Sequence, residues 1–596
     1  MGVEGEVVPV LGLGRVVRNI YIYAEMRIRD SFSGRRFRSM LFTASVSVCA
    51  EFVNVFIDKV VAAQFLGDSA LAAISFFTPL FSFIFFMSAV VMVGSLVCYS
   101  IELGRMNKEK ADRFFGQSLI LSFIVGVFMV VLFSAGKGIM FGVMEVEPEL
   151  LNYVNEFYGW FLGLAFIIPL NNTLQEMVYV DGDTGTCKAS YAALLLGNLV
   201  LSCIFCRFMG MSGIALGTLL SVMLSIIVLC THFARKNNSL RFVWHFNMRD
   251  SMSVIRFSIA EACEFFFFAL FAGLMNLYFV ANFSSDRITV LSVVYEIVEL
   301  SVVFNGIWMA AEPLINIYRG EDNDRGVLQV MRFVNWTVLK ESLLATAILL
   351  FCAPLLTHVF HIRSEELAGE MAFAIRACAV GLCPLALVKI YAAFHVHEKP
   401  VLSFIFILFV MFLSPVVCVM GAGALWGGEY VWLGFGAAPF LAMGLCAGVQ
   451  VLIYGRARFP LLLEHLTVAD YWHMHDMLLT PENLIAYRDS VGELLKRKSV
   501  NEMSVVKAML LLEEMGMSVY ERNAGRRVFV EFAVLLREKD FVLVIKDDGK
   551  IMDLTDLEQS VTGLRAYLVS MFMTVQREKQ YLLTSNYNRH VFRFDR

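Results

Sequence analysis

Long apolar segments are the feature that most constrains how this 596-residue chain can fold. A helix that crosses a bilayer needs about 20 mostly apolar residues. Hydrophobic residues make up 58% of the sequence, against roughly 45–50% in soluble domains, and the excess is concentrated in long stretches. We therefore predict an α-helical polytopic membrane protein of about twelve transmembrane helices, near 40–64, 73–99, 115–136, 151–179, 187–207, 211–232, 255–281, 289–316, 334–358, 371–394, 401–423 and 431–454.

The loops between the predicted helices alternate in positive charge. Loops after even-numbered helices are basic, as with Arg105 and Lys108 after the second and Arg235 and Arg241 after the sixth, whereas the other loops contain only scattered cations. Basic loops stay on the cytoplasmic side of a membrane. The pattern predicts a multi-pass protein of the cell inner membrane with both termini in the cytoplasm.

A weak internal repeat divides the predicted membrane part into two six-helix halves. Asp68 opens the second helix and Asp286 opens the eighth, and each of these helices ends beside a Gly and an Arg before a charged loop. Transporters with such repeats place their site between the repeats near the middle of the bilayer. We predict a cytoplasmic N-terminal segment (1–38), a first transmembrane half (39–240), a second transmembrane half (241–460), a linker (461–490) and a soluble α/β domain (491–596).

The composition changes after Pro460 to that of a soluble α/β domain. Val505–Tyr520 is apolar with a helical period, whereas Arg527–Leu535 and Phe541–Ile545 alternate like strands. All twelve Cys residues lie at or before Cys446, which fits a tail in the reducing cytosol.

Ionisable side chains inside the predicted helices are the main functional candidates. A charge at the centre of a membrane helix costs roughly 2.5–3.5 kcal/mol on insertion scales, so such residues usually face a cavity or a partner. Glu51, Asn54 and Asp58 are spaced three and four apart, which places them on one face of the first helix. The other candidates are Asn198 in the fifth helix, Glu261 and Glu264 on one face of the seventh, and Glu296 and Glu299 on one face of the eighth.

Two interpretations of these acids fit the sequence. A carboxyl group in a dry cavity can trade a proton or Na⁺ for a cationic substrate, which is the chemistry of an antiporter. A carboxylate can instead pair with a lysine and only hold helices together. Lys59, Lys340 and Lys389 are the available partners.

Several motifs resemble, in order and spacing, those of the multidrug and toxic compound extrusion (MATE) family. They are Asn54-Val-Phe-Ile-Asp58, Gly116-Gln117, Asp181-Gly182-Asp183, Asn198-Leu-Val-Leu-Ser202 and Glu312-Pro313. The resemblance implies a secondary antiporter that exports organic cations or toxic compounds in exchange for Na⁺ or H⁺, with Asp58 as the first-helix aspartate of the family. Ser202 departs from the family pattern, which often has Asp there, and Glu261 and Glu264 lie only near the usual acid of the seventh helix.

The last hundred residues resemble the ATPase fold shared by histidine kinases and anti-sigma factors. The matching residues are Glu513-Glu514-Met515, Asp547-Asp548-Gly549, Thr562-Gly563-Leu564 and Asn588. The resemblance implies Glu514, Asp548, Gly549, Gly563 and Asn588 as nucleotide-binding candidates. Ser518 stands where that fold carries a metal-holding Asn, so we predict a regulatory ATPase-like domain with weak or absent hydrolysis, and ATP binding is left open.

We predict a transporter rather than an enzyme, with no catalytic residues, no metal site and no required cofactor besides Na⁺ or H⁺ as coupling ion. The expected partners are the lipid bilayer, a small cationic or amphipathic substrate and a cytosolic regulatory protein at the tail. Nucleic acid is not expected, because the chain has no basic stripe.

Two other functions fit the sequence less well. A flippase of amphipathic or lipid-linked substrates would favour cationic grooves over acidic helix faces. A membrane sensor kinase needs a helical hairpin with a phosphoacceptor His before its ATPase domain, and residues 461–495 are too short for one.

Overall fold

The computed structural model of the chain describes residues 31–66, 68–105, 107–143, 151–235, 238–283, 285–359, 365–396, 399–455, 472–550, 577–578 and 587–595. The chain forms two compact units. We call them the membrane unit (Met40–Asp322 and Thr337–Leu466) and the tail unit (Met1–Ser39, Asn323–Trp336 and Thr467–Arg596). Each is described by itself below.

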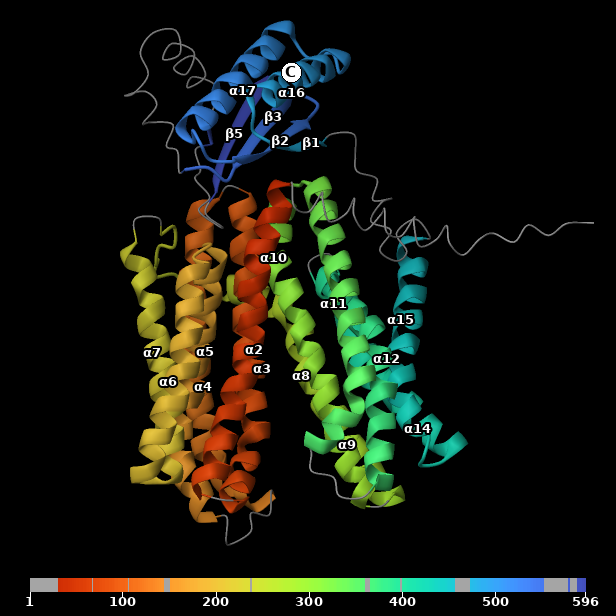
Figure 1. The fold of residues 1–596 in the computed structure, drawn as a ribbon. Helices are drawn as coiled ribbons and strands as arrows, with labels where there is room; N and C mark the ends of the chain where they lie inside the picture. The colour runs from red at the N-terminus through yellow and green to blue at the C-terminus, as the bar shows by residue number, and fades with distance from the viewer. Residues whose placement is uncertain are drawn as a thin grey trace, which may run out of the picture. The chain divides into compact units, whose positions relative to one another are not determined.

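The membrane unit is built from long helices in the order that the sequence predicts (Figure 1). The first half comprises α2 (Phe32–Leu66), α3 (Asp68–Gly104), α4 (Lys108–Val143), α5 (Leu151–Val180), α6 (Thr184–Met209), α7 (Met211–Cys230) and the 3₁₀ turn η1 (Thr231–Ala234). The second half comprises α8 (Met248–Asn282), α9 (Ser285–Leu300), η2 (Ser301–Phe304), α10 (Asn305–Gly320), α11 (Asp324–Val359), α12 (Glu365–His395), α13 (Pro400–Leu408), η3 (Phe409–Leu413), α14 (Ser414–Trp426) and α15 (Trp432–Tyr454).

Within the described residues, ten helices are long and apolar enough to cross a membrane. The other two predicted segments, 40–64 and 289–316, fall on α2 and on the run from α9 to α10. The second of these is not one continuous helix, because the 3₁₀ turn η2 interrupts it. The predicted helix 401–423 likewise contains a π-helical turn at η3.

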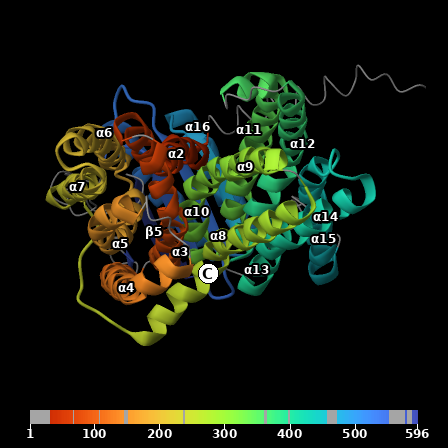
Figure 2. The same cartoon turned by 90° about the horizontal axis from the view of Figure 1, so that it is seen from below.

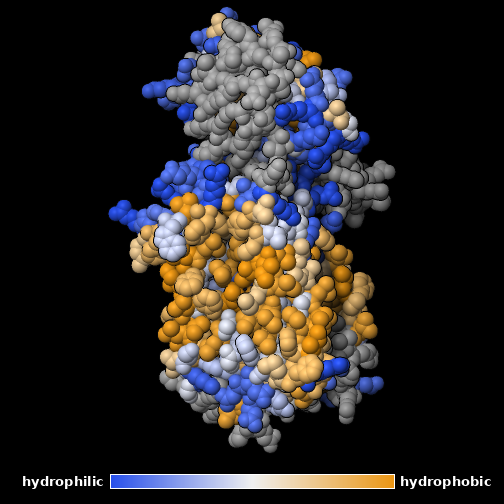
Figure 3. Space-filling model, turned by 90° about the vertical axis from the view of Figure 1, so that its left-hand side faces the viewer, coloured by the Kyte–Doolittle hydropathy of each residue, from blue (hydrophilic) through white to orange (hydrophobic). Residues whose placement is uncertain are grey.

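Apolar side chains cover the outside of the membrane unit. Phe208, Phe351 and Leu452 are each more than four-fifths exposed, at 81%, 85% and 86%. Figure 3 shows a broad band of hydrophobic residues with hydrophilic residues at its edge. Such a surface suits the hydrocarbon core of a bilayer, where apolar side chains need no cover from other protein.

The two halves meet where α3 packs against α8 and α10. A Cβ on Gly94 of α3 would lie 1.9 Å from the backbone oxygen of Val254 on α8, and one on Gly320 of α10 would lie 2.3 Å from that of Ile101. Small residues allow helix backbones to approach this closely. Seen from below, α4 to α7 gather on one side and α12, α14 and α15 on the other (Figure 2).

The tail unit contains a small antiparallel sheet of five strands in the order β1-β2-β3-β5-β4. The strands are β1 (Trp472–Leu478), β2 (Phe529–Leu536), β3 (Asp540–Asp547), β4 (Arg577–Glu578) and β5 (Asn588–Asp595). Helices α16 (Pro481–Arg497) and α17 (Glu502–Arg522) pack against the sheet through a core that includes Leu512, Phe532 and Phe541.

Part of the segment predicted as a linker is folded. Residues 472–478 form β1, which pairs with β2, and α16 begins within the predicted linker range. Thr480 caps α16 by accepting a hydrogen bond from the backbone N–H of Asn483, and Pro481 occupies the first turn. Pro is common in the first turn of a helix, so this part of the predicted linker belongs to the folded tail.

A row of charged residues crosses four strands of the sheet. The strand register places Asp476 opposite Glu531, Glu531 opposite Lys546, and Lys546 opposite Arg589. The Lys546 Nζ lies 2.9 Å from Glu531 Oε1, and both side chains are almost completely buried. Asp476 accepts a hydrogen bond from Gln329, so the first turns of α11 belong to the tail unit.

Candidate functional site

Asp58 is a buried carboxylate held by two neighbouring helices. Only 5% of the residue is exposed. Asn198 on α6 donates to Oδ1 through Nδ2 over 2.9 Å, and the Thr218 hydroxyl on α7 lies 3.0 Å from Oδ1 and 2.9 Å from Oδ2. The structure therefore brings together Asp58 and Asn198, which the sequence predicted, with Thr218, which it did not.

Asn198 is oriented by two more side chains. The Ser202 hydroxyl donates to Asn198 Oδ1 over 2.7 Å, which leaves the amide NH₂ to face α2. That NH₂ lies 3.0 Å from Asn54 Oδ1 as well as 2.9 Å from Asp58. Gly217 permits the close contact of α6 and α7, since a Cβ there would lie 2.5 Å from the backbone nitrogen of Ser202.

The described donors to the Asp58 carboxylate, an amide and a hydroxyl, are both neutral. Within the described residues, no Lys, Arg or His forms an ion pair with Asp58. Thr218 has one hydroxyl hydrogen, and the carbonyl oxygen of Ile214 also lies 3.0 Å from its Oγ1. The amide and the hydroxyl thus stabilise the carboxylate without balancing its charge, and a mobile cation or proton can do so.

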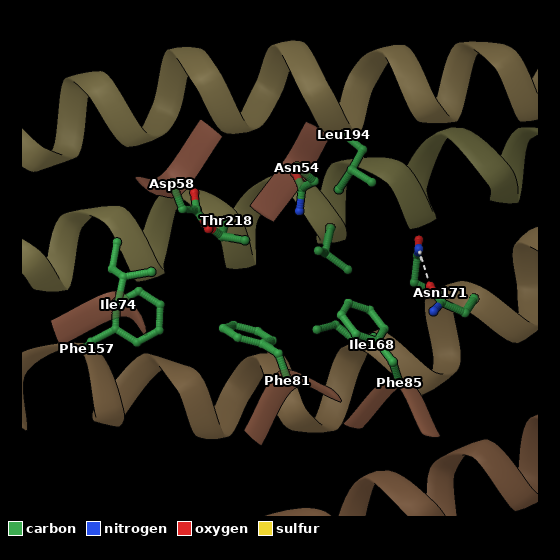
Figure 4. Close-up of a pocket in the computed structure, with 12 residues that line it drawn as sticks. Asn54, Asp58, Ile74, Phe81, Phe85, Phe157, Ile168, Asn171, Leu194 and Thr218 are labelled. Carbon is green, nitrogen blue, oxygen red and sulfur yellow. Dashed lines mark hydrogen bonds between the residues drawn. The ribbon is translucent and has the colours of Figure 1, made fainter. Parts of the chain in front are cut away.

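A cavity of about 50 Å³ lies beside Asp58. A buried water needs roughly 10–15 Å³ by this kind of measure, so the cavity has room for a few waters or a small ion. Asp58, Asn54 and Thr218 line one side, and Phe81 and Phe85 of α3 line the side across from them (Figure 4). The site therefore combines one acid with aromatic faces.

A chain of hydrogen bonds leads away from the cavity wall. Asn171, which lines the cavity, accepts from the Ser225 hydroxyl over 2.8 Å. Ser225 lies 2.9 Å from the Ser190 hydroxyl, and Ser190 donates to Gln175 over 2.6 Å. Uncharged polar residues in apolar helices leave no periodic or charge signal, so the sequence did not indicate this chain.

The Asp181-Gly182-Asp183 motif holds a buried histidine of η1. His232 lies 2.9 Å from Asp181 through Nε2 and 2.9 Å from Asp183 through Nδ1. Asp183 also caps α6 by accepting from the backbone N–H of Thr186, and it pairs with Arg235 at 2.8 Å. The motif therefore ties the ends of α5, α6 and α7 together.

Comparisons with known proteins agree with this architecture. Residues 44–206 match the MatE family model. The chain is similar to the outward-facing structure of a multidrug resistance MATE family transporter of the MOP superfamily, at 20% identity and a TM-score of 0.66, over 73% of this chain and 97% of that one. The described membrane helices have the MATE transporter fold.

Two further structures have the same MATE fold. One is a MOP superfamily transporter from Pyrococcus furiosus, described as having a binding pocket of reverse polarity that suggests a different function (19% identity, TM-score 0.64, 72% of this chain and 96% of that one). The other is the Vibrio cholerae MATE transporter VcmN in its bent form (16% identity, TM-score 0.63, 70% and 98%). A comparison with curated proteins gives no match.

Glu264, in the second half of the MATE fold, has a lysine partner. The Lys389 Nζ on α12 lies 2.6 Å from Glu264 Oε1 on α8, and the exposed fractions of the two side chains are 3% and 10%. The structure thus gives Glu264 the structural pairing that the sequence offered as the alternative to coupling. The side chains of Glu51, Glu261, Glu296 and Glu299 lie outside the described residues.

The tail residues predicted to bind nucleotide lie partly together. Asn588 donates to Asp547 Oδ1 over 2.8 Å, and the backbone N–H of Gly549 donates to the same oxygen over 2.9 Å. Burial raises the pKa of Asp547 to about 6, although the hydrogen bond from Asn588 opposes the shift. Asp548 accepts instead from the backbone N–H of Phe529.

The remaining tail candidates are not part of this described cluster. Glu514 lies on α17, and Gly563 lies outside the described residues. Asn523 was not predicted, yet its side chain accepts from the backbone N–H of Lys550 directly beyond Gly549. In the part of the chain that the structure describes, no group of three or more His, Cys, Asp or Glu could hold a metal ion. The ATPase resemblance of the tail stays a prediction.

Proposed function

We propose that this protein is a transporter, not an enzyme, and works as a secondary antiporter that exports organic cations or toxic compounds in exchange for H⁺ or Na⁺. The observation that carries the proposal is the buried Asp58 carboxylate, which neutral donors hold at the wall of an aromatic cavity. The MATE fold and the MatE match of residues 44–206 support it.

Competition for one negative charge would couple the two fluxes. A proton or Na⁺ at Asp58 neutralises the carboxylate, and a monovalent organic cation can take its place only when that ion leaves. Phe81 and Phe85 face the acid across the cavity and offer ring faces to a flat cation. Exchange of the two occupants then accompanies the alternating access of the halves.

The cavity favours this function over a flippase. A flippase of amphipathic or lipid-linked substrates would favour cationic grooves over acidic helix faces. The residues that line the described cavity include one carboxylate and no Lys or Arg.

We extend the proposal to topology and the tail. The protein spans the inner membrane twelve times, with α2 and the run from α9 to α10 completing the ten candidate helices, and both termini lie in the cytoplasm. The tail regulates transport and contacts a cytosolic protein or ATP. Support comes from two contacts within the tail unit: Arg35 of α2 lies 3.7 Å from Asp548, and Gln329 of α11 binds Asp476. Both helices continue into the membrane unit, so a change in the tail reaches them directly.

The substitution Asp58→Asn tests the coupling role. It keeps the shape of the side chain and removes its charge. The purified protein would be reconstituted in liposomes. The liposomes would be loaded with ethidium, a fluorescent monovalent cation, and given an inward H⁺ or Na⁺ gradient. Because the acid is the group that exchanges cations, we expect gradient-driven efflux to fall to the level of protein-free liposomes.

The matched control is Asp489→Asn, the same chemical change at a residue on α16 whose side chain is 56% exposed. It should leave efflux unchanged. Full efflux by the Asp58 variant, inserted to the same level as the wild type, would remove Asp58 from the mechanism.

A further inference from the structure

The second half of the membrane unit contains a buried ion pair whose cation belongs to the protein itself. Lys389 Nζ lies 2.6 Å from Glu264 Oε1 and 3.4 Å from the hydroxyl of Ser301 in η2. Both charged side chains are at least nine-tenths buried. The carboxylate of Glu264 is therefore neutralised without any mobile ion.

Residues that line a second cavity lie on α8 and α12, the same two helices as this ion pair. That cavity, of about 30 Å³, is lined by apolar residues that include Phe268 on α8, Ile297 on α9 and Leu385 on α12. Glu264 precedes Phe268 by four positions, Ser301 follows Ile297 by four, and Lys389 follows Leu385 by four. Residues four apart lie on one helix face, so all three polar residues lie one turn away from the cavity lining.

The buried acids Asp58 in the first half and Glu264 in the second half have chemically different partners. Asp58 meets an amide and a hydroxyl, whereas Glu264 meets an ammonium group. A mobile cation that bound Glu264 would have to displace Lys389, which is tethered to the same chain and therefore has a high effective concentration. It would also leave a buried ammonium unpaired, which is strongly unfavourable.

We propose, resting on the proposed antiport at Asp58, that Lys389 is a built-in counter-cation that excludes Glu264 from ion coupling. Each transport cycle then exchanges one coupling ion for one monovalent organic cation. Lys389 sets the coupling ratio without touching the substrate, and its loss frees Glu264 to bind a second ion.

The coupling ratio can be measured as an equilibrium accumulation. Full-length protein in liposomes is given a tenfold H⁺ or Na⁺ gradient with the membrane potential held at zero by valinomycin and equal K⁺, and the ethidium ratio is followed to its steady value. With one ion per ethidium the ratio reaches about tenfold, and with two ions about a hundredfold. One-for-one exchange also moves no net charge, whereas two-for-one exchange gives a transport current.

We expect about tenfold accumulation and no current for the wild type, and about a hundredfold accumulation with a current for Lys389→Met. A tenfold, electroneutral Lys389→Met variant would overturn the inference and leave the proposed function standing. A wild-type ratio near a hundredfold would also overturn it, since the ratio counts ions bound at any acid of the chain. No gradient-driven movement in the wild type would overturn the antiport itself.

A second variant tests the inference if Lys389→Met alone does not fold. Glu264→Gln combined with Lys389→Met removes both charges and leaves no unpaired group. Because neither residue takes part in coupling in this scheme, the double variant should keep the wild-type ratio of about tenfold and stay electroneutral. Loss of coupling in a well-inserted double variant would show that the pair takes part in ion exchange, and would refute the proposal.

Discussion

Raising the pH should weaken the tail unit, because its folded state holds a proton near Asp476. Burial raises the pKa of this carboxyl to about 8, and the charge of Glu531 on the neighbouring strand adds to the shift. The hydrogen bond from Gln329 and the charge of Lys546 act in the opposite direction but are outweighed. The same group titrates near 3.9 in an unfolded chain.

The direction of the pH dependence of tail stability is set by which state binds the proton more tightly. Since the folded tail binds the proton more tightly than the unfolded tail does, stability is highest below about pH 4 with respect to this group and falls as the pH rises toward 8. At about 1.4 kcal/mol per pKa unit, the shift corresponds to a loss on the order of 5 kcal/mol across that range.

Hydrogen exchange of the full-length protein measures this effect. We expect the amides of β1 and β2 to lose protection between about pH 5 and pH 9, after correction for the intrinsic exchange rate, because local opening becomes easier. Asp476→Asn should flatten the pH dependence, whereas Asp489→Asn on the exposed face of α16 should keep it. Equal protection of the wild type at both pH values, or an unchanged pH dependence in Asp476→Asn, would show that Asp476 holds no proton in the folded tail.

Two further substitutions test the packing of each unit. Lys546→Met should destabilise the tail by about 3–5 kcal/mol, because it removes the cation that pairs with the buried Glu531 carboxylate. Thermal unfolding measures this, and adding Glu531→Gln should recover part of the loss. Gly217→Ala should lower gradient-driven ethidium efflux at least about tenfold, because the new Cβ meets the backbone of Ser202 and a displacement of about 1 Å can cost a hundredfold in rate. Gly273→Ala, whose Cβ would have nothing within 4 Å, should transport normally.

The sequence contained enough information for the helices and for one wall of the site. Apolar length alone indicates the segments, and the spacing of Asn54 and Asp58 places them on one helix face. Thr218 escaped prediction because a hydroxyl in an apolar helix looks like any other small residue. Its role exists only once α7 lies against α2 and α6.

The 3₁₀ turn η2 and the strand β1 could not be predicted from the local sequence pattern either. The segment 289–316 is long and mostly apolar, and nothing in its pattern marks the 3₁₀ turn at Ser301–Phe304. Trp472–Leu478 is short and contains two His residues, so it does not look like a strand by itself. Its pairing with β2 makes it one, and such long-range pairing is not encoded in local pattern.

The pairing of Lys389 with Glu264 could not be predicted from the sequence alone. The sequence supplied both residues and the idea of a lysine partner, but three lysines and several acids gave no unique match. Only the packing of α12 against α8 selects the pair. The internal repeat suggested two equivalent halves, and this pair makes them chemically different.

The different partners of Asp58 and Glu264 affect how much charge an empty carrier must move without a counter-ion. If Asp58 and Glu264 were both exchangeable, an empty carrier would have to change conformation with two unbalanced charges, at roughly 2.5–3.5 kcal/mol each. With Lys389 in place, the charge of Glu264 is balanced, and of these two acids Asp58 alone would impose the cost. A single ion or a single organic cation then removes the whole penalty, so either occupant allows the halves to move while the empty site resists. That rule is the condition for obligatory exchange, and in the proposed antiport Lys389 would reduce it to the occupancy of Asp58.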